Sequence, residues 1–128
     1  MSDPRKRIYR ITRCIWLGPY ASLERGEALR AAGISHILNV GEAPSVLAAE
    51  DGQIREVTWR PVLDLERIPD KIAIDCITHL HRMVCEPRAN IYVHCIAGQN
   101  RSPTIVWLYL IACGSQPEIA KNMIVRRA

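Results

Sequence analysis

The stretch that decides the predicted fold is IYVHCIAGQNRSP, residues 91–103. It opens with a short apolar run, Ile91 to Val93, which follows a turn-like segment and is typical of a buried strand. An almost uniformly apolar run from Thr104 to Cys113 predicts a helix, with Pro103 in its first turn and Ser102 as its N-cap. The order strand, tight loop, helix therefore organises the chain.

The loop between this strand and this helix is predicted to bind an anion. A helix N-terminus presents unpaired backbone N–H groups and the positive end of the helix dipole. Gly98 allows the backbone to curl inward, and Arg101 supplies a planar guanidinium that matches two oxygens of a phosphoryl group. The same positive groups stabilise a thiolate, so we expect Cys95 to be ionised at neutral pH.

The spacing His-Cys-x5-Arg-Ser, from His94 to Ser102, resembles the signature of the cysteine-dependent protein tyrosine phosphatases. Its continuation to Thr104, with the shortness of the chain, resembles their dual-specificity branch. The resemblance implies that Cys95 is the nucleophile that forms a phosphocysteine intermediate, and that Arg101 binds phosphate and stabilises the transition state. The alternative is a chance Cys-x5-Arg spacing around a buried structural cysteine, but the flanking strand and helix favour the functional interpretation.

The resemblance also assigns roles to the neighbours of Cys95. It implies that Ser102 donates to the sulfur as it departs and that His94 braces the loop from behind. It further implies that backbone N–H groups hold the equatorial phosphoryl oxygens. The residues that supply these N–H groups are Ile96, Ala97, Gly98, Gln99, Asn100 and Arg101.

A proton donor for the leaving oxygen is expected on the loop between Pro61 and Asp70. General acid catalysis of this kind accelerates a reaction by about 10² to 10⁴. Asp64 lies upstream of Cys95 between two leucines, and its spacing and context resemble those of the family's acid. Asp70 and Glu66 are the alternatives, with Asp70 expected to cap the following helix instead.

The front half of the chain resembles the same family. It reads as a short strand pair ending in Leu17-Gly18, a helix, Ala32-Gly33-Ile34, and then Ile37-Leu38-Asn39-Val40. The implied fold is a single α/β domain with a central, mostly parallel mixed sheet flanked by helices, and the phosphate-binding loop lies between the last strand and the central helix. Asn39 is expected either to support that loop or to be an ordinary polar residue at a strand end.

Local patterns predict the remaining elements. Ser22 is the expected N-cap of the first helix and Gly33 its C-terminal stop. His79 and His81 lie two residues apart on one predicted helix, so they do not share a face and do not suggest a metal pair. Predicted strands cover 8–11, 14–17, 36–40 and 54–59; predicted helices cover 22–32, 44–50 and 70–84, with a last one behind a capping box at 115–118.

Composition predicts one domain over residues 8–128 behind a basic, partly frayed tail over 1–7. The chain has 128 residues, is 48% hydrophobic and carries a net charge of +4, which is concentrated in its first residues. Five cysteines without a Cys-x-x-Cys pair argue against a disulfide framework and a zinc site. We expect no metal, no cofactor, no membrane partner, a monomeric state and a cytoplasmic location.

Phosphorylated proteins or peptides are the expected substrates, with a phosphate or sulfate ion fitting the same loop. A shallow pocket would accept phosphotyrosine, phosphoserine and phosphothreonine. The variable loop residues are neutral, whereas related phosphoinositide phosphatases tend to carry lysines there. The alternatives are an RNA 5′-phosphatase or another non-protein ester phosphatase, for which the basic tail leaves nucleic acid as a less favoured partner. A non-catalytic phosphate-binding module and a sulfurtransferase rank lower, because Cys95, Arg101 and Asp64 are all present.

Overall fold

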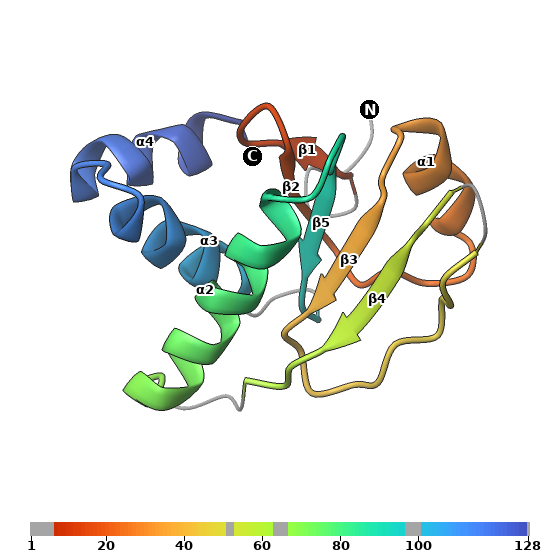
Figure 1. Ribbon diagram of the computed structural model, residues 1–128, viewed down its shortest axis with the longest axis horizontal. Coiled ribbons are helices and arrows are strands. Elements are labelled where there is room, and N and C mark those ends of the chain that lie inside the picture. Colours follow the sequence, from red (N-terminus) through yellow and green to blue (C-terminus); the bar gives the residue numbers. More distant parts are fainter. Residues whose placement is uncertain (1–6, 51–52, 63–66, 97–100, 128) are drawn as a thin grey trace.

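The structure, a computed structural model, describes residues 7–50, 53–62, 67–96 and 101–127. A five-stranded sheet forms its centre, with helices on both sides (Figure 1). In chain order the elements are β1 (Tyr9–Arg10), β2 (Ile15–Gly18), α1 (Gly26–Ala31), β3 (His36–Asn39), β4 (Glu56–Trp59), α2 (Asp70–Val84), β5 (Ile91–His94), α3 (Arg101–Ala112) and α4 (Pro117–Arg127).

The sheet has the strand order β1-β2-β5-β3-β4. Only β1 is antiparallel to its neighbour, so the predicted mostly parallel mixed sheet is confirmed. The central strand β5 pairs in register with β2 and β3, so that His94 lies opposite Gly18 and Asn39. The parallel strands end at one edge of the sheet, which is where ligands bind in open α/β sheets. The segments that follow β3 and β5 therefore meet at this edge.

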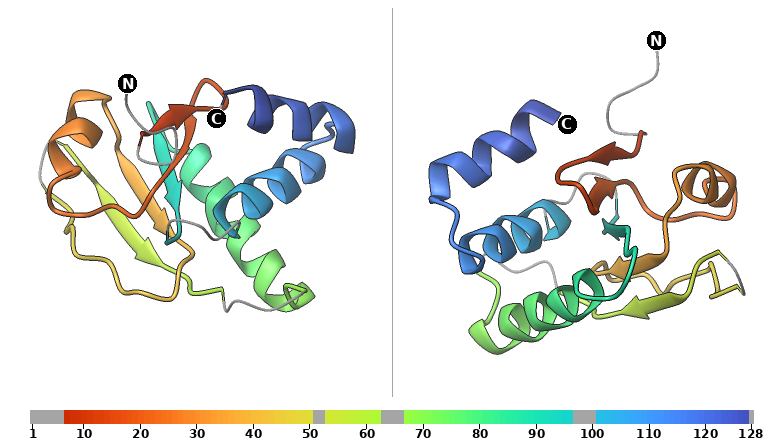
Figure 2. Two further views of the ribbon diagram at one scale, coloured as in Figure 1. Left: turned by 180° about the vertical axis from the view of Figure 1, so that it is seen from behind. Right: turned by 45° about the horizontal axis from the view of Figure 1, so that its top comes forward.

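Each central strand is buried on both faces, as parallel strands usually are. Side chains alternate between the two faces along a strand. Leu38 and Val93 pack into the core under α2, α3 and α4, while Ile37 and Tyr92 pack into a second core under α1. Figure 2 shows α1 on one side of the sheet and the other three helices on the opposite side. The central strand is therefore held rigidly from both sides.

The helices that depend on apolar periodicity lie where the sequence predicts them. The predicted bounds of α2 agree residue for residue with the structure, and its buried side chains Cys76, Leu80 and Met83 recur at helical spacing. α3 contributes Ile105, Val106 and other apolar side chains to the core. Within the described ranges, no helix combines the length and the apolar character needed to cross a membrane.

The predicted helix over residues 44–50 is wrong, because this segment has no regular structure. Its polar groups are engaged elsewhere: the Asn39 side-chain amide donates to Ser45 Oγ, and the Tyr20 hydroxyl donates to the Pro44 carbonyl. A helix this short is costly to nucleate. These tertiary hydrogen bonds therefore decide the conformation of the segment.

The first helix begins later than predicted. α1 starts at Gly26, and Ser22 caps the preceding turn instead, since its Oγ accepts a hydrogen bond from the Arg25 N–H at 3.3 Å. The predicted stop is confirmed: Gly33 has a φ of 78°, the left-handed conformation that glycine adopts readily after a helix.

Candidate active site

Cys95 follows the last residue of β5 and lies close to the first turn of α3. It is 4% exposed. Its Sγ lies 3.3 Å from the hydroxyl Oγ of Ser102, which is also buried. The strand end and the helix start face each other, so residues seven positions apart meet. Ser102 is the second residue of α3, so its predicted role as N-cap is wrong; its hydroxyl contacts the sulfur instead.

Several predicted site residues lie outside the described residues. The candidate acids Asp64 and Glu66 are among them. So is most of the predicted anion-binding loop, Ala97, Gly98, Gln99 and Asn100, whereas Ile96 is described and half-buried. The roles of these residues, including the backbone N–H groups of the loop, stay predictions.

Arg101 is the first residue of α3 and is 5% exposed. Its Nη1 donates to Glu42 Oε1 at 3.2 Å and also to the Val62 carbonyl. Its other two nitrogens, Nε and Nη2, are buried and have no hydrogen-bond partner among the described residues. Buried polar groups almost always have a partner, and leaving one unpaired is costly. The unpaired donors are therefore suited to an oxyanion, which a guanidinium can bind with two nitrogens.

Glu42 is a site residue that the sequence patterns do not reveal. It lies just beyond the end of β3 and is partly exposed. The pairing of β3 with β5 brings it to the same sheet edge as Cys95. The only sequence signal is its position after a predicted central strand, where ligand-binding segments tend to lie.

Asn39 shapes the segment that follows β3. It is fully buried, and its Nδ2 donates to the Ala43 carbonyl at 2.8 Å and to Ser45 Oγ at 3.1 Å. Its Oδ1 accepts a hydrogen bond from the Gly41 N–H at 2.9 Å. Its hydrogen bonds therefore order residues 41–45, the segment that carries Glu42, and the expected support of the phosphate loop is indirect.

Gly41 links this segment to the cysteine. A Cβ at this position would lie 3.2 Å from Cys95 Cα and 3.3 Å from the Ile96 nitrogen. The Gly41 carbonyl accepts a hydrogen bond from Trp59 Nε1 at 2.8 Å, which fixes the segment from the β4 side. The absence of a side chain at Gly41 is therefore what allows the two backbones to approach so closely.

His94 is buried beneath the site on the α1 side of the sheet. Its ring stacks on Tyr92 at 5.6 Å and meets Tyr20 edge-on at 5.3 Å. Burial lowers the pKa of His94 to about 4, so the imidazole is neutral at physiological pH. Neither ring nitrogen has a partner with hydrogen-bond geometry in the part of the chain that the structure describes. The predicted bracing of the loop by His94 stays a prediction.

Asp70, the alternative acid, does not cap α2 as predicted. It is the first helical residue, while Pro69 holds the N-cap position and no side chain caps the helix. The Asp70 side chain is 81% exposed and pairs with Arg67 at 3.4 Å. Asp70 thus lies one residue past the cap position, where a carboxylate interacts with the helix dipole rather than with a specific N–H group.

Together these residues combine a cysteine with groups that favour negative charge. A hydroxyl contacts the sulfur, a guanidinium with two unpaired donors begins the next helix, and the positive end of that helix lies at the same place. Such an arrangement can bind a tetrahedral oxyanion and stabilise charge on a transferring phosphoryl group.

Comparison with known proteins gives one consistent family. A family model described as "PTP-SAK: Swiss Army Knife protein, DSP-PTPase phosphatase domain" matches residues 19–127. The protein-tyrosine-phosphatase IBR5 of Arabidopsis thaliana is 31% identical over 98 residues, covering 76% of this chain and 34% of the relative. Human dual specificity protein phosphatase 15 is 31% identical over 101 residues, covering 76% of this chain and 32% of the relative. The chain thus spans about a third of the length of these curated relatives.

Solved structures share the fold. A mouse putative dual specificity phosphatase superposes with a TM-score of 0.79 at 21% identity, covering 98% of this chain and 77% of the other. The crystal structure of DUSP15 has a TM-score of 0.76 at 26% identity, covering 93% of this chain and 74% of the other.

Proposed function

This chain belongs to the family of DSP-PTPase phosphatase domains, which are cysteine-based phosphatases, and from that premise we propose that it is a dual-specificity protein phosphatase. It removes phosphate from phosphotyrosine and from phosphoserine or phosphothreonine of proteins. The reaction passes through a phosphocysteine intermediate on Cys95.

The observation that carries this proposal is the environment of Arg101. Its guanidinium is buried at the start of the helix whose next residue, Ser102, contacts the cysteine; it is oriented by Glu42 and the Val62 carbonyl and keeps two donors unpaired among the described residues. A phosphoryl group bound there would accept both hydrogen bonds and place its phosphorus near Cys95 Sγ. Positioning and electrostatic stabilisation of this kind account for most of phosphoryl-transfer catalysis.

The proposed reaction has two steps. In the first, the Cys95 thiolate attacks phosphorus, the bond from phosphorus to the ester oxygen breaks, and Asp64 protonates the leaving oxygen. In the second, Asp64 accepts a proton from a water that attacks phosphorus, and the sulfur–phosphorus bond breaks. Ser102, whose Oγ lies 3.3 Å from Sγ, donates to the departing sulfur and stabilises it as a thiolate.

Protein substrates are favoured by the names of the relatives. One is called a protein-tyrosine-phosphatase and another a dual specificity protein phosphatase, and both are 31% identical to this chain. The side chains at the variable positions of the predicted loop are neutral, which favours a phosphopeptide over a more highly charged ligand. For the whole protein we also propose a cytoplasmic location and a monomeric state.

Single-turnover hydrolysis tests the proposed nucleophile. We expect the wild type to cleave p-nitrophenyl phosphate and phosphotyrosine, phosphoserine and phosphothreonine peptides, and Cys95→Ser to release no phosphate from any of them. Cys113→Ser is the matched control, because this exposed cysteine lies beyond α3, away from the proposed site. Phosphate release by Cys95→Ser at the wild-type rate would refute the mechanism. Release from 5′-triphosphorylated RNA but from no peptide would refute the protein substrates.

A second pair of variants tests the acid. We expect Asp64→Asn to lose about 10² to 10⁴ in rate on phosphoserine peptides, whose alkoxide leaving group needs a proton, and to lose less on p-nitrophenyl phosphate. Asp70→Asn is the matched control and should retain the wild-type rate. The reverse result, with Asp70→Asn impaired and Asp64→Asn intact, would assign the acid to Asp70.

A further inference from the structure

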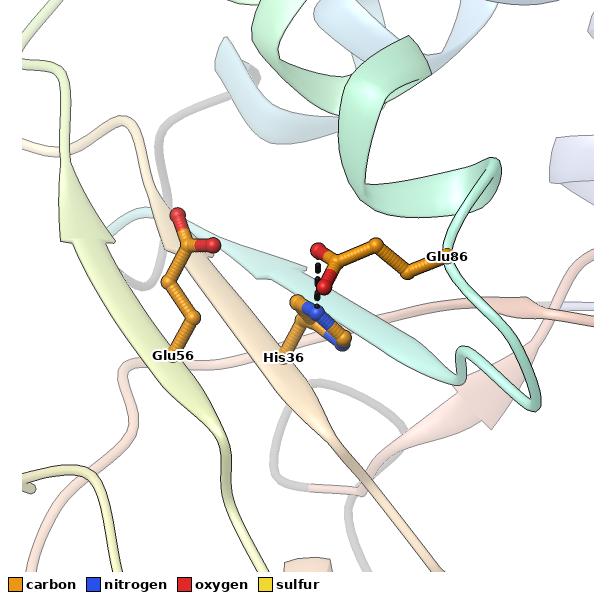
Figure 3. A group of neighbouring side chains, drawn as sticks. All are labelled: His36, Glu56 and Glu86. Atoms are coloured by element: carbon orange, nitrogen blue, oxygen red, sulfur yellow. Dashed lines mark hydrogen bonds and ion pairs between the residues drawn. The ribbon is translucent and has the colours of Figure 1, made fainter.

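A second cluster of chemically capable side chains lies at the opposite end of the sheet from Cys95. It contains His36, Glu56 and Glu86 (Figure 3). His36 and Glu56 are the first residues of β3 and β4 and lie opposite each other in register, while Glu86 follows α2. One ligand atom from each residue lies within 4.8 Å of the other two. Three separate elements therefore bring one imidazole and two carboxylates together.

The imidazole of His36 is held in a fixed orientation. It is fully buried, and its Nδ1 lies 2.7 Å from Ser35 Oγ. That hydroxyl also accepts a hydrogen bond from the Asn90 N–H at 2.8 Å and is placed to donate to the Asn90 carbonyl at 3.3 Å. When the Ser35 hydroxyl donates its one hydrogen to this carbonyl, it can only accept from His36. The hydrogen between the two residues is then on Nδ1 of His36. Nε2 then presents a lone pair to Glu86.

In this orientation, a cation is needed between His36 Nε2 and Glu86 Oε2. His36 Nε2 lies 2.8 Å from Glu86 Oε2, and two lone pairs at that distance repel each other unless a proton or a metal ion lies between them. Histidines that bind metals typically have their second ring nitrogen fixed by a hydrogen bond in the way that Ser35 fixes Nδ1 here.

Arg82 at present supplies the positive charge of the cluster. Its Nη2 donates to both oxygens of Glu56, at 2.9 and 2.7 Å, and its Nη1 lies 3.6 Å from Glu86 Oε2. Thr58 also donates to Glu56 Oε2, at 2.5 Å. The Arg82 side chain is 52% exposed and can swing into solvent if another cation takes its place.

His79 lies beside the cluster and contacts Glu56. Its Nε2 lies 2.8 Å from Glu56 Oε2 and 3.1 Å from Arg82 Nη2. A single ring nitrogen cannot donate to the carboxylate and accept from the guanidinium at once. Removing Arg82 resolves this conflict, because Nε2 can then donate to Glu56 alone and hold that carboxylate in place. A tetrahedral ion with bonds of about 2.0 to 2.1 Å needs ligands about 3.3 Å apart, so His36, Glu56 and Glu86, whose ligand atoms lie within 4.8 Å of one another, require only small movements.

We propose that His36, Glu56 and Glu86 form a binding site for a divalent transition-metal ion, with Zn²⁺ the best match, which displaces the Arg82 guanidinium. One imidazole and two carboxylates, with water completing the coordination, are ligands that this class of ion accepts. The bound ion would cross-link β3, β4 and the segment after α2, far from the phosphate chemistry. Sequence patterns predict no such site, because these ligands are widely spaced along the chain and the topology alone brings them together.

Titration with Co²⁺, a spectroscopic substitute for Zn²⁺, tests the proposal on the full chain carrying Cys95→Ser, which removes the reactive thiol. We expect one equivalent of Co²⁺ to bind by calorimetry, with d–d absorption of a tetrahedral site and no thiolate-to-cobalt charge-transfer band. Uptake of no Co²⁺, or a spectrum dominated by thiolate ligands, would overturn the proposal.

Three further variants in the same background locate the site. Glu86→Gln should weaken Co²⁺ binding at least tenfold, and Arg82→Gln should strengthen it, because the competing cation is gone. His81→Gln is the matched control: this residue lies on α2, but its Nδ1 contacts the Tyr109 hydroxyl rather than the cluster. Bound metal should also raise the melting temperature of the parent but not of Glu86→Gln. Equal affinity in Glu86→Gln and the parent would place the metal elsewhere and refute the site.

Discussion

Two buried histidines, His36 and His94, mark the two ends of the sheet and differ in how their polar atoms are satisfied. His36 begins β3, belongs to the cluster beside α2 and has a partner at each ring nitrogen, Ser35 and Glu86. His94 ends β5, lies among aromatic rings on the other face and has no hydrogen-bond partner in the described part of the chain. The same residue type is thus held by polar contacts at one end and by packing at the other.

The difference extends to the charged neighbours of each histidine. At the His36 end, Arg82 is paired with the carboxylates of Glu56 and Glu86. At the His94 end, Arg101 is buried with two donors unpaired among the described residues. Since unpaired buried donors are costly, a folded protein retains them where a ligand completes them. The comparison therefore assigns the anion to the Cys95 end and a cation to the His36 end.

The largest expected effect comes from replacing the unpaired guanidinium. Arg101→Lys keeps the charge but removes the planar pair of donors, so we expect kcat to fall by about 10² to 10³, as when an oxyanion donor is lost. Arg126→Lys, an exposed change on α4, is the control. A wild-type kcat in Arg101→Lys would show that the unpaired donors have no catalytic role, and the contrast between the two ends would fail.

The next effect is on stability at mildly acidic pH and comes from His94. Its pKa in the folded state, about 4, lies below the ordinary value of 6.5, so the unfolded chain binds more protons between these pH values. The contribution of His94 to the free energy of unfolding is therefore fully present above pH 6.5. It is lost as the pH decreases to 4, which lowers the free energy of unfolding by on the order of 3 kcal/mol. Denaturant titrations across this window should show the decrease in the wild type and a smaller one in His94→Gln. An equal decrease in both proteins would mean that His94 is not the group that titrates.

The smallest effect comes from Glu56 at the other end, in a lower pH window. Its folded-state pKa, about 2, lies below the ordinary 4.5, so its contribution is present above pH 4.5 and is lost as the pH falls towards 2. Because the side chain is partly exposed, we expect a loss of only about 1 to 2 kcal/mol. Glu56→Gln should abolish this part of the pH dependence while leaving the window above pH 4.5 unchanged. A loss between pH 6.5 and 4.5 that disappears with Glu56→Gln would contradict the assignment.

Sequence patterns predict the parts of the fold that depend on local periodicity. The amphipathic run of α2 and the apolar run of β5 carry their own signals, and both elements lie where these signals place them. The helix predicted over 44–50 is absent because hydrogen bonds from Asn39 and Tyr20, which lie outside this segment, determine its conformation. Local propensity carries no information about such partners.

The same limit applies to the site. The spacing from Cys95 to Ser102 is visible in the sequence, and the structure brings their sulfur and oxygen atoms together. Gly41 reaches the cysteine, and Glu42 reaches Arg101, only through the pairing of β3 with β5, so nothing near them in the sequence indicates a role. The His36 cluster depends in the same way on strand register, which a single sequence does not reveal.

The most direct test of the central claim, that the sulfur of Cys95 attacks phosphorus, is detection of the phosphorylated cysteine. p-Nitrophenol is a good leaving group that depends little on an acid, whereas the second step still needs a base. Asp64→Asn should therefore accumulate the intermediate with p-nitrophenyl phosphate. After acid quenching, mass spectrometry should find one phosphoryl group on the peptide that contains Cys95, and none when Cys95→Ser is added. A burst of p-nitrophenol without a phosphoryl group on the protein, or with that group on another residue, would contradict the account.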